Sequence, residues 1–439
     1  MTPATICAVA TPPGRGGVGV IRLSGPKAQS IAEHVVGELP APRYASLRVF
    51  RDQGQAAIDE GLVLFFPGPG SMTGEDVVEF QGHGGPIVLD RLLQQLLALG
   101  AELAAPGEFS QRAFLNGRLD LTRAEAIADL IEAGSEAAAQ AAMRSLQGEF
   151  ARRIAVLIEA LTELRVHLES SLDFSDEPLD GLALDQVSKR IGELSESLAE
   201  TRQAASEGQQ LQEGLTVVIA GRPNAGKSSL LNALTGRDAA IVTSLAGTTR
   251  DVLDSHLHLE GLPLRVLDTA GLRVGGDVVE QEGVKRAQAA MAEADRILWV
   301  AEDNHEHDDF HAALPANVPI TRVINKIDLS GRSPGIVDDV VAVSALTGEG
   351  LPALRAYLRG SMAAKPSETI FTARRRHLVA LDAAAEALTE AQQAAVSGLG
   401  EELMAESLRE AQSQLGEITG AVSTEDLLGR IFSTFCIGK

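Results

Sequence analysis

Eight residues near the middle of the chain have the types and spacing of a phosphate-binding loop. Gly221–Ser228 reads GRPNAGKS, in which two glycines bracket four residues and precede Lys227 and Ser228. The apolar run 215–220 is typical of a buried parallel strand, and 228–234 has a helical composition. Backbone amides at such a strand-to-helix turn bind phosphate oxygens at the helix N-terminus. The pattern predicts that Lys227 contacts the β- and γ-phosphates of a nucleotide and that the Ser228 hydroxyl binds Mg²⁺.

Three further motifs, each following a strand-like apolar run, indicate which nucleotide is bound. Asp268-Thr269-Ala270-Gly271 supplies a carboxylate that would hold Mg²⁺ through water. Asn325-Lys326-Ile327-Asp328 has the pattern with which GTPases select guanine, because the Asp328 carboxylate accepts hydrogens from guanine N1 and N2. Ser344-Ala345 stands where GTPases place the loop that contacts the guanine carbonyl. The four motifs in this order predict a GTP-binding domain.

The group that orients the attacking water does not stand where many small GTPases have it. In those proteins a glutamine follows the D-x-x-G motif directly, whereas this chain has Leu272, which cannot orient water. Glu280 is the candidate replacement, although an acidic residue there also suits a helix N-terminus. Gly247-Thr248-Thr249-Arg250-Asp251 supplies a threonine at the switch position that senses Mg²⁺ and the γ-phosphate. Arg250 and Arg273 are candidates for a built-in arginine finger, with ion-pair or surface roles as the alternative.

Length, charge and cysteine content limit the class of protein. A chain of 439 residues is long enough for roughly two to four domains. A formal net charge of -22 argues against tight, unaided binding of nucleic acid, because that requires clustered Lys and Arg, but it permits nucleic acid presented by a partner. Two cysteines, Cys7 and Cys436, exclude a disulfide framework and fit a reducing compartment. With no signal-peptide pattern and no apolar stretch long enough to span a bilayer, we expect a cytoplasmic protein with no membrane contact.

Residues 1–118 mix strand and helix patterns. We predict strands at 5–10, 18–23, 46–50 and 62–66 and helices at 26–36 and 86–99. The glycines at 14, 16 and 19 have the spacing of a dinucleotide-binding fingerprint, but a β-branched run follows them instead of a helix, so we interpret them as a turn between strands. We interpret 73–76 and 82–86 as a second set of loops, in which His83 makes hydrogen bonds.

Helical patterns occupy 119–214 and return from 372 to the end of the chain. Thr122 and Glu125 have the spacing of a capping box. Apolar residues spaced by three and four predict amphipathic helices: Leu146, Phe150, Ile154, Leu157, Leu161, Leu164 and Leu168; Val187, Ile191, Leu194 and Leu198; then Leu378, Leu381, Ala385, Leu388, Leu403, Leu408, Ala411 and Leu415. Since the GTPase segment separates these stripes, we infer that it is inserted into one helical domain.

The predicted fold class is therefore multidomain, with α/β and α+β parts. A P-loop GTPase domain with a doubly wound, mostly parallel sheet is inserted into a helical domain, and an α+β domain precedes both. The predicted boundaries are 1–118 for the N-terminal domain, 119–214 and 371–439 for the two helical parts, and 215–370 for the GTPase.

The sequence resembles the tRNA modification GTPases of the MnmE family, also called TrmE, along essentially its whole length. The motifs that carry this resemblance are TPPGRGGVGVIRLSG, TGEDVVEFQGHGGP, PGEFSQRAFLNGRLDLTRAEAIADLI, GRPNAGKSSLLNAL, AAIVTSLAGTTRD, DTAGLR and the terminal CIGK. The resemblance implies an N-terminal domain that binds folate and forms a homodimer. It also implies a FAD-dependent partner, MnmG or GidA, in a heterotetramer or larger complex. Together they would add an aminomethyl or carboxymethylaminomethyl group to carbon 5 of the wobble uridine of tRNA, with a one-carbon unit from 5-formyl- or methylene-tetrahydrofolate.

The resemblance also implies residue roles. The folate contacts would be Arg22, Glu79, Arg118 and Lys439, with Arg118 in place of the lysine that similar sequences have. Glu280 would be catalytic, K⁺ would bind through Asn224, Thr243, Leu245 and Thr248, and Mg²⁺ through Ser228 and Thr249. The expected GTP contacts are Asn224, Ala225, Gly226, Lys227, Ser228, Ser229, Thr243, Ser244, Leu245, Ala246, Gly247, Thr248, Thr249, Asp268, Thr269, Ala270, Gly271, Asn325, Lys326, Asp328, Ser344 and Ala345.

Two functions remain open at this point. The first is a GTPase whose K⁺-activated G-domain dimerisation drives tRNA modification, with the cation in place of an arginine finger. The alternative is a regulatory or ribosome-assembly GTPase without substrate chemistry of its own. A pure switch has no need of a folate pocket, so the N-terminal loops and Lys439 favour the first. Cys436 is either a spectator thiol or a chemical group next to that pocket.

Overall fold

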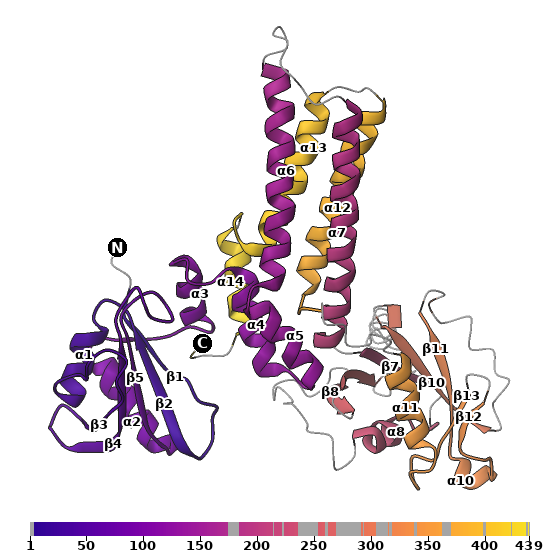
Figure 1. Ribbon diagram of the computed structural model, residues 1–439. Helices are drawn as coiled ribbons and strands as arrows, with labels where there is room; N and C mark the ends of the chain where they lie inside the picture. Colours follow the sequence, from indigo (N-terminus) through magenta and orange to yellow (C-terminus); the bar gives the residue numbers. More distant parts are fainter. Residues whose placement is uncertain are drawn as a thin grey trace, which may run out of the picture. The chain divides into compact units, whose positions relative to one another are not determined.

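The computed structural model describes residues 4–173, 184–213, 215–221, 224–235, 253–259, 262–268, 291–292, 294–303, 315, 318–337, 340–361, 370–397, 401–422, 424–435 and 438. The chain forms two compact units (Figure 1). The first combines Met1–Ala128, Ser145–Ala199 and Val379–Lys439, and the second combines Asp129–Arg144 and Glu200–Leu378. These units are the parts of the chain that pack compactly, and they do not correspond one to one to the predicted domains. The boundaries expected at residues 118, 214 and 370 therefore stay predictions.

A six-stranded sheet in the order β3-β4-β5-β2-β1-β6 opens the first unit. Its strands are β1 (Ile6–Val9), β2 (Gly16–Ser24), β3 (Ser46–Arg51), β4 (Ala57–Phe66), β5 (Val77–Gly84) and β6 (Glu102–Leu103). All neighbours are antiparallel except β1 and β6. Helices α1 (Ala28–Val36) and α2 (Pro86–Ala98) share a buried core with alternate strand residues such as Ile21, Leu23 and Phe80. The expected strands and helices are thus present. The interpretation of the glycines at 14, 16 and 19 as a turn is only partly right, because Gly14 lies between β1 and β2 whereas Gly16 and Gly19 belong to strand β2.

The interpretation of 82–86 as a loop is wrong. Residues 82–84 continue strand β5, with Gly82 opposite Gly19 and Gly84 opposite Gly16 in the neighbouring strand β2. The backbones approach so closely that a β-carbon on Gly84 would lie 2.7 Å from the carbonyl oxygen of Gly16. Glycine therefore serves strand pairing here and not a turn.

A helix that the sequence analysis did not predict, α3 (Glu108–Leu115), contributes to the other face of this sheet. Phe109 of α3 is fully buried in a small apolar cluster with Ile6, Ala8, Met72 and Ala104. Since Ile6 and Ala8 alternate with the core residue Cys7 along β1, this cluster lies on the face opposite α1 and α2. The sheet is therefore covered on both faces at the β1–β2 end.

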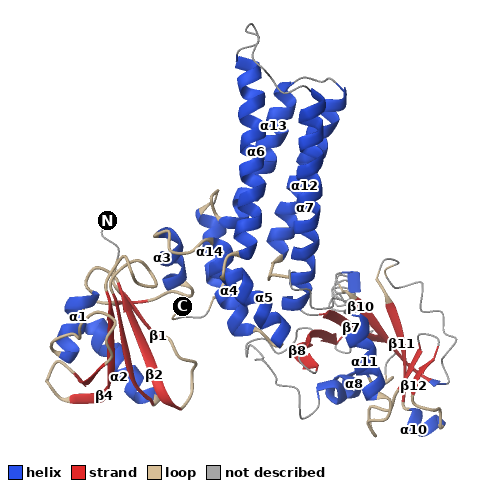
Figure 2. Ribbon diagram, in the orientation of Figure 1, coloured by secondary structure: helices blue, strands red, loops and turns tan. Residues whose placement is uncertain are grey.

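The predicted helical parts of the chain contain α4 (Leu121–Glu132), α5 (Glu136–Leu146), α6 (Glu149–Asp173), α7 (Leu184–Glu213), α12 (Arg375–Ser397), α13 (Glu401–Thr419) and α14 (Glu425–Ser433). The long helices run side by side as a bundle, without strands (Figure 2). The predicted stripe of α6 is buried from Phe150 to Leu168. Gln412 of α13 accepts from Arg165 at 2.6 Å and donates to Thr162 at 3.1 Å, so a polar contact also joins α13 to α6.

Three details of the helical prediction need correction. Leu146 ends α5 and is not part of α6. Leu403 is 49% exposed, and the adjacent Met404 is buried in its place. The capping box at Thr122 is wrong, because α4 begins at Leu121 and Asp120 accepts from the backbone amide of the third residue on, at 3.0 Å.

The second unit contains a seven-stranded sheet in the order β12-β13-β11-β10-β7-β9-β8. Its strands are β7 (Leu215–Gly221), β8 (Leu253–Leu259), β9 (Leu262–Asp268), β10 (Arg296–Glu302), β11 (Ile320–Asn325), β12 (Gly335–Val337) and β13 (Val340–Ala342). The five inner strands are parallel, and β8 and β12 are antiparallel edges. Separate apolar clusters lie about the sheet, one of them packing α8 (Lys227–Thr235) and α11 (Leu351–Ser361) against β7. This confirms the predicted doubly wound, mostly parallel sheet.

Over the residues described, no helix combines the length and the apolarity that crossing a membrane requires.

Candidate functional site

The predicted GTP motifs meet at one edge of the parallel sheet. Strands β7, β9 and β11 end at the first residues of their motifs, which are Gly221, Asp268 and Asn325, and β13 ends shortly before Ser344. Since these strands are parallel neighbours of the inner sheet, their carboxyl ends lie at the same edge. The backbone of Asp268 lies opposite Ile219, two residues before Gly221.

The phosphate-binding loop closes on a buried asparagine. Lys227 is 8% exposed, and its ammonium donates to the carbonyl oxygen of Gly221 at 2.9 Å, across the bend of the loop. Gly226 adopts φ +88°, and a β-carbon there would lie 2.3 Å from Nδ2 of Asn325. That amide nitrogen instead donates to the carbonyl oxygen of Ala225 at 3.0 Å. The glycine is thus required both by its backbone conformation and by the approach of Asn325.

Asn325 connects the phosphate side of the site to the base side. Its Oδ1 accepts from the backbone amide of Ala345 at 3.0 Å, while its Nδ2 holds Ala225. Asn325 is 2% exposed, so both ends of a buried carboxamide are hydrogen-bonded. One side chain thereby fixes the loops after β7 and β13 relative to each other.

Asp328 is oriented by a serine. The Ser344 hydroxyl, fully buried, donates to Oδ1 of Asp328 at 2.5 Å and accepts from the amide of Thr347 at 3.1 Å. Asp328 itself is exposed. The arrangement leaves carboxylate lone pairs directed to the solvent side, as acceptance of guanine N1 and N2 hydrogens requires.

Lys326 is held by two partners, one of which the sequence analysis missed. Its ammonium donates to the carbonyl oxygen of Asn224 at 2.7 Å and to Oε1 of Glu302 at 2.5 Å. Glu302 ends β10, between the strands that lead to the phosphate and base motifs. The signal that could have found Glu302 is its place as the carboxylate directly after the apolar run 297–301. Next to it, a hydrogen bond from Arg332 lowers the pKa of Asp303, so this carboxylate is ionised at neutral pH.

Several predicted site residues lie outside the described part of the chain. They are Thr243, Ser244, Leu245, Ala246, Gly247, Thr248, Thr249, Thr269, Ala270, Gly271, Glu280, Cys436 and Lys439. Their roles stay predictions. Ser228 and Ser229 are described and occupy the first turn of α8.

Two of the predicted folate residues form an ion pair on the sheet of the first unit. Arg22 on β2 stands opposite Glu79 on β5, and its Nε and Nη2 donate to Glu79 Oε1 at 3.0 and 2.8 Å. Both side chains are mostly buried, 18% and 17% exposed. Nη1 of Arg22 donates to the carbonyl oxygen of Gly438 at 3.2 Å. The structure therefore brings the residue before Lys439 to this pair, across more than four hundred residues of sequence.

Arg118 stands beside a different segment. Its Cγ would lie 3.3 Å from a β-carbon built on Gly74, in the loop before β5, and its side chain is exposed. His83, interpreted above as a hydrogen-bonding residue, is hydrogen-bonded to Asp59 through Nδ1 at 2.7 Å, although it does so from strand β5.

Comparison with known proteins identifies the family of the chain. The family profile "MnmE helical domain" matches residues 121–436, and "GTP-binding protein TrmE N-terminus" matches residues 5–118. The tRNA modification GTPase MnmE of Alkalilimnicola ehrlichii is 57% identical over 444 residues, covering 100% of both chains. Proteins of the same name from Erwinia tasmaniensis and Yersinia pseudotuberculosis are 51% and 52% identical over 449 residues, covering 99% of each chain. The chain belongs to the MnmE (TrmE) family of tRNA modification GTPases.

Proposed function

We propose that this chain hydrolyses GTP at the edge of the second unit's sheet where the parallel strands have their carboxyl ends. We propose further that it uses GTP hydrolysis, together with MnmG, in the modification of wobble uridine in tRNA. The observation that carries the GTPase part is the linked set of Asn325, Lys326, Asp328 and Ser344. These residues join the phosphate loop to a carboxylate presented for guanine. The family to which the chain belongs supports the tRNA part.

For hydrolysis we propose Glu280 as the residue that orients the attacking water, with Ser228 and Thr249 on Mg²⁺. A bound K⁺ near the β- and γ-phosphates would supply the positive charge that an arginine finger supplies in other GTPases, an effect of roughly 10³ to 10⁵ in rate. On the described side of this site, the main-chain oxygen of Asn224 accepts from Lys326. The side-chain carboxamide of Asn224, which is exposed, is then the group that we assign to K⁺. Thr243, Leu245 and Thr248 would complete that site.

The experiment for this part compares GTP turnover by the full chain in K⁺ and in Na⁺. We expect fast hydrolysis in K⁺, slow hydrolysis in Na⁺, and K⁺-dependent association of the GTPase domains with a transition-state mimic. Glu280→Ala should lose turnover and keep its affinity for GTP. Equal rates in the two salts would contradict the role of the cation, and full activity of Glu280→Ala would contradict that residue's role.

For the first unit we propose a tetrahydrofolate site at Arg22, Glu79 and Lys439, with Arg118 at its edge. The support is that Arg22 and Glu79 form a mostly buried ion pair on the sheet, and that the carbonyl oxygen of Gly438 accepts a hydrogen bond from Arg22. A partly buried guanidinium suits the anionic glutamate tail or the polar pterin edge of a folate. Arg22→Ala or removal of Lys439 should abolish retention of 5-formyl-tetrahydrofolate while GTP hydrolysis persists. Normal folate affinity in both variants would contradict the assignment.

The tRNA function is tested in cells. We expect wobble uridines to lack the aminomethyl-type group when the gene is deleted, and nucleoside analysis of bulk tRNA reports this directly; unchanged wobble uridine would remove the proposal. A net charge of -22 further predicts weak, salt-sensitive binding of tRNA by the isolated protein, strengthened by MnmG. We propose that the modification takes place in the cytoplasm and that the chain acts as a homodimer, which joins MnmG in a larger complex.

A further inference from the structure

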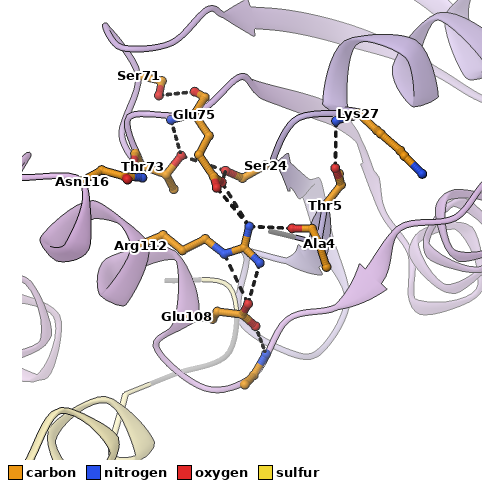
Figure 3. Close-up of polar contacts among 11 residues, drawn as sticks. Ala4, Thr5, Ser24, Lys27, Ser71, Thr73, Glu75, Glu108, Arg112 and Asn116 are labelled. Carbon is orange, nitrogen blue, oxygen red and sulfur yellow. Dashed lines mark hydrogen bonds and ion pairs between the residues drawn. The ribbon is translucent and has the colours of Figure 1, made fainter. Parts of the chain in front are cut away.

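A mostly buried arginine beside the proposed folate contacts joins separate segments of the first unit. Arg112 lies on α3 and is 12% exposed. Its Nη1 donates to the carbonyl oxygen of Ala4 at 2.7 Å and to both carboxylate oxygens of Glu75 at 3.2 Å, and its Nη2 donates to Glu108 at 2.7 Å (Figure 3). A planar guanidinium can serve all of these acceptors at once because its five donors are fixed in one plane. Arg112 thereby fixes α3 to the loop before β5 and to the start of the chain.

The loop side of this network is anchored on the same sheet face as Arg22. The Ser24 hydroxyl lies 2.7 Å from Glu75 Oε2 and 2.7 Å from the Thr73 hydroxyl. Asn116, at the end of α3, donates to the carbonyl oxygen of Thr73 at 2.7 Å (Figure 3). Ser24 and Arg22 are two residues apart on β2, so their side chains leave the sheet on one face. The loop 71–76 is therefore tied to that face and to α3 together.

Two residues near the proposed folate site depend on the position of α3: Phe109 lies on the helix, and Arg118 follows it. The ring of Phe109, three residues before Arg112, is fully buried, and its centroid lies 5.7 Å from Cζ of Arg22. Arg118 follows the helix and stands next to Gly74. Because an α-helix moves as a unit, a shift of α3 would displace Phe109 from Arg22 and change where Arg118 lies.

The charge of Arg112 is already matched within the protein. Glu75 and Glu108, at 14% and 22% exposed, accept from it on two sides. A guanidinium paired with two carboxylates adds no net positive charge for an anionic ligand. Its contribution to binding must therefore come through geometry and not through direct attraction.

We propose that Arg112 is a positioning residue of the folate site, which holds α3 and the loop 71–76 so that Phe109 supports Arg22 and Arg118 meets the ligand. This inference rests on the proposed folate function of the same unit. Its ligand is a tetrahydrofolate with an anionic tail.

The test measures binding of 5-formyl-tetrahydrofolate to the full-length protein by calorimetry. Arg112→Gln should lower the affinity at least about tenfold, because Glu75 and Glu108 lose a shared partner and the helix is released. Arg112→Lys should recover part of the loss, since one ammonium reaches one carboxylate but not all three acceptors. Arg91→Gln, which breaks an exposed 3.5 Å pair with Asp52 in the same unit, is the matched control and should bind normally.

Binding is measured at a temperature where circular dichroism shows that every variant is folded. A variant that is only less stable then binds folate with normal affinity, and a lower affinity reports a change in the site. Should Arg112→Gln fail to fold, Asn116→Ala takes its place. It removes only the bond to Thr73 and should weaken binding several-fold. Normal affinity in the folded variants, while Arg22→Ala binds poorly, would overturn the role of Arg112. Failure of the unmodified protein to bind folate is a different result, and it would remove the proposed folate function together with this inference.

Discussion

Replacing Ser344 with alanine tests whether guanine recognition depends on the hydroxyl that orients Asp328. In the structure this hydroxyl donates to Asp328 at 2.5 Å and accepts from the Thr347 amide. A hydrogen bond to a charged group contributes about 1.5–3 kcal/mol, and each 1.4 kcal/mol is about tenfold in affinity. Since Asp328 is exposed, water replaces part of the lost bond, so we take the lower end of this range. Ser344→Ala should therefore weaken binding of GDP by about tenfold.

The assay is dissociation of a fluorescent GDP analogue, measured with competing GDP and inosine diphosphate. Inosine lacks the N2 amino group, so a well-oriented Asp328 prefers GDP, and the loss of Ser344 should shrink that preference. Thr347→Val is the matched control, because its hydroxyl accepts only a weak 3.4 Å bond from the Glu349 amide in the same loop. Unchanged GDP affinity and preference in Ser344→Ala would refute the reasoning.

Three further predictions concern other parts of the chain. Gly226→Ala should weaken GTP binding at least about tenfold in the same assay, because φ is +88° and the new methyl group meets Asn325; normal affinity would contradict this. Burial raises the pKa of the Cys7 thiol to about 12, so about one thiol in 10⁴ is ionised at pH 8, and mass spectrometry should find Cys7 alkylated only after denaturation. Burial raises the pKa of Asp59, but hydrogen bonds from the amide and ring of His83 and from the Glu60 amide, together with the charge of His83, lower it below its ordinary value. A lowered pKa stabilises the fold above the ordinary carboxyl pKa, so the destabilisation by Asp59→Asn in urea titrations should be present at pH 7 and fade below about pH 4; a loss that persists there would refute the pairing.

Where a motif and its flanking elements are contiguous, the sequence predicted the elements and the position of the motif between them. The phosphate loop lies between an apolar strand and a helix, and the base motifs directly follow strands, because local pattern determines both element and position. The stripe of α6 was predicted for the same reason, since spacing by three and four is a property of one helix. The capping box failed because the spacing of Thr122 and Glu125 does not fix where the helix begins, and α4 begins at Leu121, one residue before Thr122.

Contacts between distant segments could not be read from the sequence. Arg112 and Glu75 are separated by 37 residues, and Arg22 and Gly438 by 416. No periodicity marks such pairs, because their meeting depends on the strand order and on α3 lying across the sheet. The strand β5 was missed for a related reason, since its glycines follow turn statistics until the pairing with β2 is known.

The two candidate sites share one structural principle. Each is organised by a mostly buried side chain that makes hydrogen bonds to separate segments of the protein. Asn325 joins the loops of Ala225 and Ala345, and Arg112 joins Ala4, Glu75 and Glu108. Such a residue transmits any shift of one segment to the other, because its bonds cannot be replaced by water when it is buried. Asn325 accordingly couples the phosphate end of the GTP site to the base end. A shift of the phosphate loop would displace the Ser344 loop through this single carboxamide. Asn325→Ala should then weaken guanine recognition and phosphate binding together, whereas loss of Ser344 affects the base alone.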